Sequence, residues 1–177
     1  MNRTLRKTTM PNATPAETAF RSLIRAFGRL ERIMEPYFAT FGISGAQWGV
    51  LRNLQRAEDE EGLVGLRLTD LGRRLLVRPP SVTGIVDRLE RARLVARAAE
   101  EGDRRSRRVS LTDLGRQLVE RVLSVHRRQI GQVMGGLDTV EQVELGRLLG
   151  QLNGHLEKLE DNRPVTPAGK VRGRAAG

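Results

Sequence analysis

The chain has 177 residues, with 31 Lys or Arg, 21 Asp or Glu and no cysteine. This length suits a single domain with extensions, and the net charge of +10 favours an anionic partner such as nucleic acid. The absence of cysteine excludes disulfides, thiol nucleophiles, thiol redox switches and Cys-ligated zinc. Because no apolar run reaches the roughly 18–20 residues of a membrane-spanning helix and no secretory signal begins the chain, we expect a cytoplasmic protein without membrane contact.

The positive charge is concentrated at both ends and in one central segment. Residues 1–14 carry +3, residues 162–177 carry +4, and residues 67–110 carry +6, from twelve arginines and six acids. The ends are polar or contain Pro and Gly, so we expect 1–15 and 162–177 to be disordered tails. Charge in a solvated tail needs no partner, and the central cluster is therefore the stronger indication of an anionic ligand.

Two helices are expected before the central cluster. Apolar residues at steps of three and four predict a helix over 16–41, and Pro36 predicts a kink or an end within it. The polar face of this helix carries four arginines: Arg21, Arg25, Arg29 and Arg32. Ser44 is a good N-cap for a second helix, which turns Trp48 inward.

The central segment predicts a helix-turn-helix. Residues 66–68 suit a very short strand, and Thr69 is expected to cap the helix that follows. A tight connector at 77–80 leads into a second helix within 80–95, since Pro is tolerated in the first turn of a helix. The buried stripe of this second helix has the spacing i, i+3, i+4, i+7: Val82, Ile85, Val86 and Leu89. Two short helices across a tight turn are typical of the helix-turn-helix motif.

A hairpin and two longer helices follow. Residues 94–98 and 107–111 are short strand-like runs around a Gly/Asp turn. Thr112 is an N-cap for a long helix, and Asp138 or Thr139 caps a last helix with a row of leucines on one side. The sequence therefore predicts a mainly α fold with one small β-hairpin.

A helix-turn-helix followed at once by a charged hairpin is the winged form of the motif, and it fits duplex DNA. The second helix can lie in the major groove, where each base pair presents a distinct pattern of donors and acceptors. The hairpin tip then projects toward the adjacent minor groove, whose negative potential attracts a guanidinium group. We therefore expect Arg105 to contact DNA and Asp103, two residues away, to brace it. The opposing interpretation is a solvated loop arginine beside a turn-forming aspartate.

The other DNA-binding candidates lie in the second helix, just before it and in the hairpin. Ser81 and Thr83 either contact DNA from the exposed side of the helix or only form its first turn. Arg88 either reaches DNA or pairs with acids inside the domain. The remaining candidates, for which a solvent-facing role stays open, are Arg78, Pro80, Arg104 and Arg107.

Taken in order, these segments resemble the MarR (multiple antibiotic resistance regulator) family of bacterial winged-helix repressors. The resemblance covers roughly residues 17–160, and each piece is weak alone while the ordered set is specific. The matching pieces are QWGVL at 47–51, LTDLGRRLLV at 68–77, SVTGIVDRLE at 81–90, GDRRSRRVSLTDLG at 102–115 and the closing Leu-rich helix. The acidic insertion EDEEGLVG at 58–65 departs from the family pattern and should only lengthen a loop.

The resemblance implies a homodimer that holds two winged helices against a pseudo-palindromic operator in double-stranded DNA. The MarR-like domain would span 16–161, with dimerisation helices at 16–41 and 112–161 and the winged helix-turn-helix at 44–111. The wide apolar stripes of the terminal helices agree with this, because such stripes need a partner. Half-sites about one helical turn apart would follow from the two-fold symmetry.

The resemblance also places a ligand cavity between the dimerisation helices and the DNA-binding lobe. Tyr37, Phe38 and Trp48 would line it, although Trp48 also reads as an ordinary core residue. The function expected is a repressor released from its operator by a small aromatic effector. The alternative is a sequence-tolerant architectural protein of the chromosome. We expect no catalytic residues, cofactor or metal, since His126 and His155 lack supporting ligands.

Overall fold

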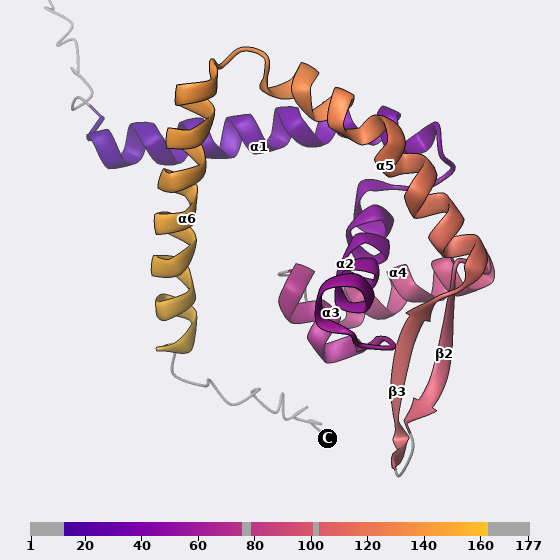
Figure 1. Cartoon of the computed structure of the whole chain (residues 1–177). Helices are drawn as coiled ribbons and strands as arrows, with labels where there is room; N and C mark the ends of the chain where they lie inside the picture. The colour runs from indigo at the N-terminus through magenta and orange to yellow at the C-terminus, as the bar shows by residue number, and fades with distance from the viewer. Residues whose placement is uncertain (1–12, 76–78, 101–102, 163–177) are drawn as a thin grey trace, which may run out of the picture. The chain divides into compact units, whose positions relative to one another are not determined.

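The computed structural model describes residues 13–75, 79–100 and 103–162, which form six helices and one three-stranded sheet (Figure 1). The chain forms two compact units, residues 1–129 and 130–177. The predicted fold class, mainly α with a small β-hairpin, is confirmed. Among the described residues, no helix is both long and apolar enough to cross a membrane.

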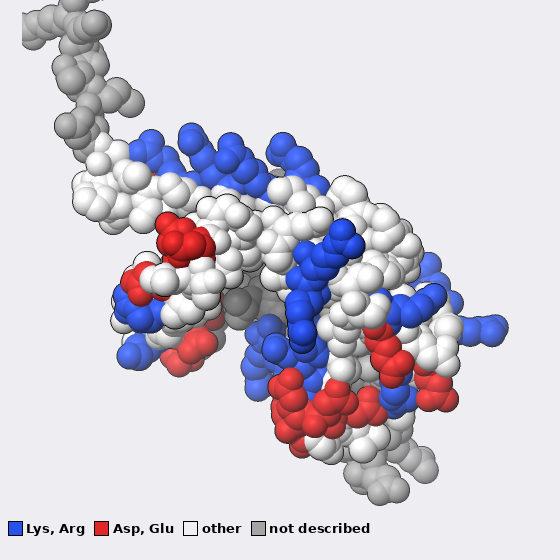
Figure 2. All heavy atoms as spheres, turned by 45° about the horizontal axis from the view of Figure 1, so that its top comes forward, with Lys and Arg blue, Asp and Glu red and all other residues white. Residues whose placement is uncertain are grey.

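The first two helices begin at capping boxes that the sequence encodes. Helix α1 (Pro15–Ala39) begins one residue before the predicted start, because Thr14 accepts from the amide of Glu17 and Pro15 occupies the first turn. It continues past Pro36 to Ala39. Helix α2 (Gly45–Glu61) is capped by Ser44, as predicted. Figure 2 shows basic side chains in a row over α1.

The helix-turn-helix is formed by α3 (Leu68–Leu75) and α4 (Pro79–Arg91). The two-residue strand β1 (Leu66–Arg67) was predicted, but Thr69 as an N-cap was wrong, because α3 begins directly after the strand and Thr69 lies in its first turn. The connector at 76–78 lies outside the described residues.

Helix α4 ends at Arg91, four residues before the end of the predicted segment. Arg93 adopts a left-handed conformation with φ 58°, and the amide of Leu94 donates to the carbonyl oxygen of Leu89 at 3.0 Å. These features belong to a Schellman-type helix end, which usually has Gly at the left-handed position. Because an arginine stands there, the sequence carries no signal for this stop.

The wing is longer than the predicted strands. β2 (Val95–Glu100) pairs antiparallel with β3 (Asp103–Leu111), and β1 pairs with the other edge of β3, giving the order β1-β3-β2. The register pairs Val95 with Leu111 at the base of the wing. One irregularity follows Ala99. The hairpin therefore extends well beyond the body of the lobe (Figure 1).

The core lies among α2, α3, α4, the sheet and the first half of α5 (Asp113–Met134). Two glycines allow this close packing. A Cβ at Gly115 would lie 2.1 Å from the Leu94 carbonyl oxygen, and one at Gly65, where φ is +133°, would lie 2.7 Å from the Val109 oxygen. The largest fully buried side chains are Leu51, Leu54, Leu71, Leu89, Val50, Val82, Val86, Val109, Val119 and Val122.

The last helix, α6 (Thr139–Asp161), belongs to the second unit. Of the two caps considered, Asp138 is the one used, and it accepts from the amide of Glu141 at 2.8 Å. No residue of α6 is buried in the single chain. Its exposed apolar side chains are Val140, Val143, Leu148, Leu149, Leu152, Leu156 and Leu159.

Candidate DNA-binding surface

Helix α4 has one buried face and one exposed face. Val82, Val86 and Leu89 are fully buried against the lobe. Ser81 and Thr83 are exposed, and for both the prediction is either DNA contact or a role only in the first turn of the helix. Hydroxyl groups donate to phosphate oxygens and base edges alike. The burial of one face thus fixes which side chains of α4 are available to a groove.

Arg88 is one of two exposed arginines of α4, with Arg91. It lies one turn after Gly84, and a Cβ built on Gly84 would lie 3.8 Å from the Arg88 Nη1 atom. The guanidinium therefore reaches back over the glycine along the exposed side of the helix. Gly84 offers no side chain to read a base, but it leaves this space to Arg88.

The wing contributes the remaining candidates. Arg107 is exposed on β3, whereas the neighbouring Arg108 is half-buried and donates to the carbonyl oxygen of Gly65 at 3.1 Å. Three further candidates lie in the tip half of β3, and their side chains are outside the described part of the structure: Asp103, Arg104 and Arg105. The same holds for the whole of Arg78 and for the side chain of Pro80 at the start of α4. The proposed brace between Asp103 and Arg105 stays a prediction.

Arg97 joins the hairpin to α4. From β2 it donates to Asp87 of α4 at 2.6 Å and forms a second short ion pair with Glu90. Its side chain is only 14% exposed. Burial lowers the pKa of Arg97, but the hydrogen bond to Asp87 and the charge of Glu90 more than offset this, so its pKa lies above the ordinary value. A charged clamp thus connects the hairpin to α4.

Sequence reasoning did not single out Arg97 as the link between the hairpin and α4. The signal was present in the strand alternation, because Arg97 shares the inward side of β2 with the buried Val95. An arginine on an inward face requires acidic partners nearby. Its partner Asp87 stands ten residues earlier, across the turn that ends α4, so no local pattern pairs the two residues.

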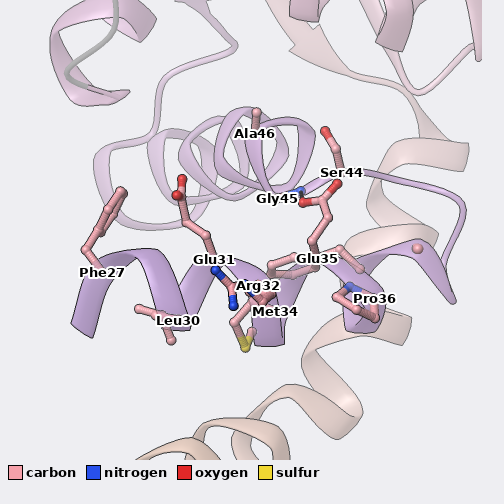
Figure 3. Close-up of a pocket in the computed structure, with 12 residues that line it drawn as sticks. Phe27, Leu30, Glu31, Arg32, Met34, Glu35, Pro36, Ser44, Gly45 and Ala46 are labelled. Atoms are coloured by element: carbon pink, nitrogen blue, oxygen red, sulfur yellow. Dashed lines mark hydrogen bonds between the residues drawn. The ribbon is translucent and has the colours of Figure 1, made fainter. Parts of the chain in front are cut away.

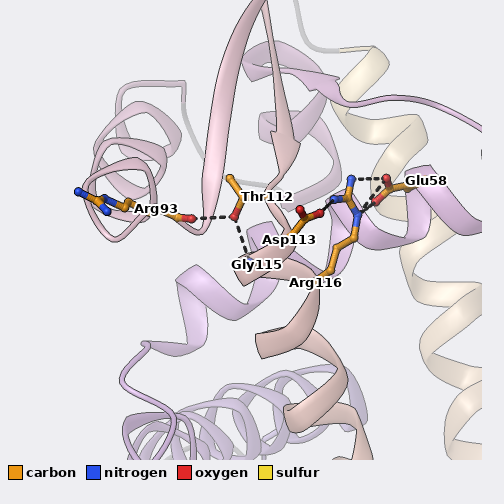
Figure 4. A network of polar contacts seen from close by, with 6 residues as sticks. All are labelled: Glu58, Arg93, Thr112, Asp113, Gly115 and Arg116. Carbon is orange, nitrogen blue, oxygen red and sulfur yellow. Dashed lines mark hydrogen bonds and ion pairs between the residues drawn. The ribbon is translucent and has the colours of Figure 1, made fainter.

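A second polar network holds the base of the wing (Figure 4). Arg116 of α5 pairs with Glu58 of α2 at 2.6 Å and with Asp113 at 2.9 Å. Thr112 caps α5 as predicted, accepting from the amide of Gly115 at 3.1 Å while it donates to the carbonyl oxygen of Arg93 at 2.7 Å. The start of α5 is therefore fixed to both α2 and the turn that ends α4.

An aromatic cluster joins α1, α2 and α5. Trp48 stacks on Phe38 with ring centroids 5.8 Å apart, and His126 of α5 stacks on Tyr37 at 5.7 Å. The Nδ1 atom of His126 lies 3.3 Å from the Tyr37 hydroxyl. Burial, with a smaller effect from the charge of Arg52, lowers the pKa of His126, and burial raises that of Tyr37.

A hollow of about 1060 Å³ lies beside α1 and the start of α2. Of the predicted ligand-pocket residues, Phe38 lines it, while Tyr37 and Trp48 lie in the aromatic cluster described above. Figure 3 shows Glu31 and Glu35 rising from α1 toward α2. The Glu35 carboxylate accepts from the first amide of α2 at 3.1 Å. The lining thus combines an apolar surface with two carboxylates.

Comparison with known proteins places the winged helix in a family. A family model described as the MarR family matches residues 41–106, from just after α1 into β3. The transcriptional regulator FarR of Neisseria gonorrhoeae is 32% identical over 157 residues, which cover 86% of this chain and 97% of FarR. The chain belongs to the MarR family. The transcriptional repressor YetL of Bacillus subtilis is a further relative, 30% identical over 142 residues that cover 80% of this chain and 83% of YetL.

A solved MarR-like structure supports the fold over most of the chain. BpsR of Bordetella bronchiseptica superposes with a TM-score of 0.67 at 28% identity, covering 77% of this chain and 99% of BpsR. The work on that structure concerns regulation of its DNA binding by 6-hydroxynicotinic acid. The resemblance seen in the sequence is thereby confirmed, and this MarR-family chain is a winged-helix, DNA-binding transcriptional regulator.

Proposed function

We propose that the chain is a homodimeric repressor that acts by binding DNA and not by catalysis. The carrying observation is the pairing of α4, with its exposed Ser81, Thr83 and Arg88, to an arginine-rich hairpin through the Arg97 clamp. A helix of this kind enters the major groove while the hairpin reaches the neighbouring minor groove or backbone. The repressor YetL, a relative over most of its length, supports repression as the outcome.

The dimer is supported by apolar faces that a single chain leaves in water. Phe20 is 65% exposed and Phe27 58% exposed on α1, and Val143 of α6 is 69% exposed. Soluble monomers rarely expose contiguous apolar surface of this extent. A second copy that covers these faces would hold two α4 helices about one turn of DNA apart, which fits a pseudo-palindromic operator.

Selection from a random duplex pool, followed by a salt series, tests the operator. The proposal expects an enriched pseudo-palindrome that binds about 10³-fold or more tightly than its scrambled sequence at physiological salt. Equal affinity for both sequences at every salt concentration would instead support the architectural alternative, in which the positive charge neutralises phosphates without reading bases.

We further propose that a small aromatic effector binds in the hollow beside α1 and releases the operator. Phe27 and Phe38 offer apolar surface for a ring, and the hollow lies in the same compact unit as α4. BpsR, whose structural work concerns regulation by an aromatic acid, supports this class of effector. An effector acts by binding more tightly to a conformation that does not fit the operator.

The charged residues that line the hollow favour an uncharged effector over a negatively charged one. Glu31 and Glu35 outnumber Arg32, the only basic residue that lines the hollow among the described residues. We therefore expect an uncharged aromatic amide to raise the melting temperature more than the matching carboxylate. A larger rise in melting temperature with the carboxylate would contradict this placement of the effector. Phe38→Ala should remove the rise in melting temperature that either compound produces.

A further inference from the structure

The four arginines of α1 form a surface that operator binding by α4 and the wing does not use. Arg21, Arg25, Arg29 and Arg32, here called the basic stripe, recur at intervals of four and three residues and therefore share one face of the helix. All four are exposed, and Figure 2 shows basic side chains in a row over α1. Arg32 also borders the hollow at the C-terminal end of the stripe.

The basic stripe and the exposed aromatic side chains of α1 lie on different faces of the helix. Phe20, Ile24 and Phe27 project about a third of a turn away from the centre of the stripe by their spacing. A partner copy that covers only those apolar side chains leaves the outer edge of the stripe in solvent. In Figure 1, α1 also lies at the end of its unit away from the tip of the β2–β3 hairpin. The stripe and the tip of the wing thus lie at different ends of the unit.

The four positive charges of the basic stripe lie close enough along α1 to repel one another. Within the described residues, none of the four forms an ion pair with an acidic side chain, although other surface arginines do, such as Arg56 and Arg147. Like charges at i and i+4 destabilise a helix. A polyanion would remove this repulsion, so the stripe gains more from binding a polyanion than four scattered arginines would.

The surroundings of the stripe favour nucleic acid among polyanions. At about 1.5 Å per residue the stripe spans about 16 Å, along which a duplex presents about ten phosphates. The exposed Thr18 and Ser22 lie beside it and supply short hydroxyl donors of the kind that contact phosphate oxygens. Between the four arginines the surface carries small polar side chains, and the exposed aromatic side chains Phe20 and Phe27, which could enter a lipid layer, lie on another face of α1.

We propose that the basic stripe of α1 binds the phosphate backbone of a second DNA segment, so that the protein bridges two duplexes. This inference extends the proposed operator binding but uses a separate surface. The contact is with phosphates and therefore independent of sequence. Each arginine that neutralises a phosphate also adds about 0.9 to the slope of log affinity against log salt.

A two-duplex capture assay tests this proposal with the full chain. A biotinylated duplex of unrelated sequence is saturated with protein on beads at low salt, and a fluorescent second duplex is then added. Arg25→Gln with Arg29→Gln should reduce the retained second duplex by about tenfold or more and lower the salt slope of its capture by about 2. Binding to the first duplex, measured alone, should be unchanged.

The matched control is Arg127→Gln with Arg128→Gln, which removes the same charge from an exposed pair on α5. It should leave capture of the second duplex intact, and an equal loss would show that only net charge matters. A wild-type chain that binds one duplex but retains no second one would overturn the stripe while leaving the regulator in place. Vesicles of phosphatidylserine that bind wild type but not the α1 variant, with duplex capture unaffected, would assign the stripe to lipid and also overturn the proposal.

Discussion

The winged-helix lobe and the terminal helices are built from similar amphipathic segments, but only the lobe completes its core within one chain. Leu51, Val82 and Leu89 have no exposed surface, whereas Phe20 is 65% exposed and no residue of α6 is buried. The lobe also connects its parts by ion pairs between elements, as Arg97 and Arg116 do. The contrast indicates that the lobe has a complete core of its own, while the terminal helices leave apolar surface exposed, as the proposed dimer requires.

The largest expected effect comes from removing the apolar face of α1. Phe20→Ser with Ile24→Ser should convert a dimer into monomers in sedimentation experiments, because each buried side chain of this size contributes about 1.5–3 kcal/mol and the dimer holds four of them. Leu89→Ala is the matched control in the lobe. It should lower the free energy of unfolding by about 2–5 kcal/mol without changing the association state. A wild-type chain that sediments as a monomer would contradict the contrast between the two regions.

The next effect in size concerns the wing tip. Arg105→Ala should weaken operator binding by about 1–3 kcal/mol if this arginine enters the minor groove. Asp103→Ala should cost less, since it only loosens the arginine. Arg128→Ala, on α5, is the control for loss of one charge and should leave affinity nearly unchanged. Operator titrations measure all three, and an Arg105→Ala protein with wild-type affinity would show that the wing does not carry binding.

A smaller effect is expected at the Arg97 clamp. Arg97→Met keeps the packing of the side chain but leaves Asp87 and Glu90 unpaired, so the free energy of unfolding should fall by about 1 kcal/mol, a figure discounted for the exposure of the two acids. Operator affinity should fall as well, because the wing is no longer held against α4.

The control for the clamp is Arg74→Met, which breaks the 2.5 Å pair between α3 and Glu61 of α2. It should cost a similar amount of stability with less effect on affinity, since Arg74 does not touch the wing. If both variants change affinity in proportion to their loss of stability, Arg97 contributes to the fold alone and does not position the wing.

The smallest effect is a pH dependence at the aromatic cluster. Burial lowers the pKa of His126 from its ordinary 6.5, so the folded state binds the proton less readily than the unfolded chain. The stability from neutral His126 is complete above pH 6.5 and is lost as the pH falls through its lowered pKa. His126→Phe should flatten this part of the denaturation profile. His155→Phe on α6 is the control and should leave the pH dependence of denaturation as in wild type. A flattened profile in this control would show that the pH dependence does not come from His126 alone.

Periodicity and capping signals were enough to predict most of the fold. The apolar spacing of Val82, Ile85, Val86 and Leu89 predicted α4 and its buried face. The predicted N-caps of α2, α5 and α6 are the ones found: Ser44, Thr112 and Asp138. The end of α4 was missed because Arg93, and not glycine, takes the left-handed position. The Thr69 cap was wrong because β1 runs directly into α3.

The site was predictable as a surface but not as a set of contacts. Charge and the order of elements indicated α4 and the wing, since both depend on local sequence. The Arg97 clamp joins residues ten positions apart through a turn whose geometry no local pattern specifies. The hollow beside α1 likewise depends on how two helices pack, and this explains why only Phe38 of the three predicted pocket residues lines it.

The most direct test of the account is the spacing of half-sites in a selected operator. Two copies of α4 related by two-fold symmetry require half-site centres about 10 base pairs apart. Insertion of about half a helical turn, 5 base pairs, between them places the half-sites on opposite sides of the duplex. The account predicts that affinity then falls about 10³-fold, to that of unrelated DNA. An operator that tolerates this insertion without loss would contradict paired binding by a symmetric dimer.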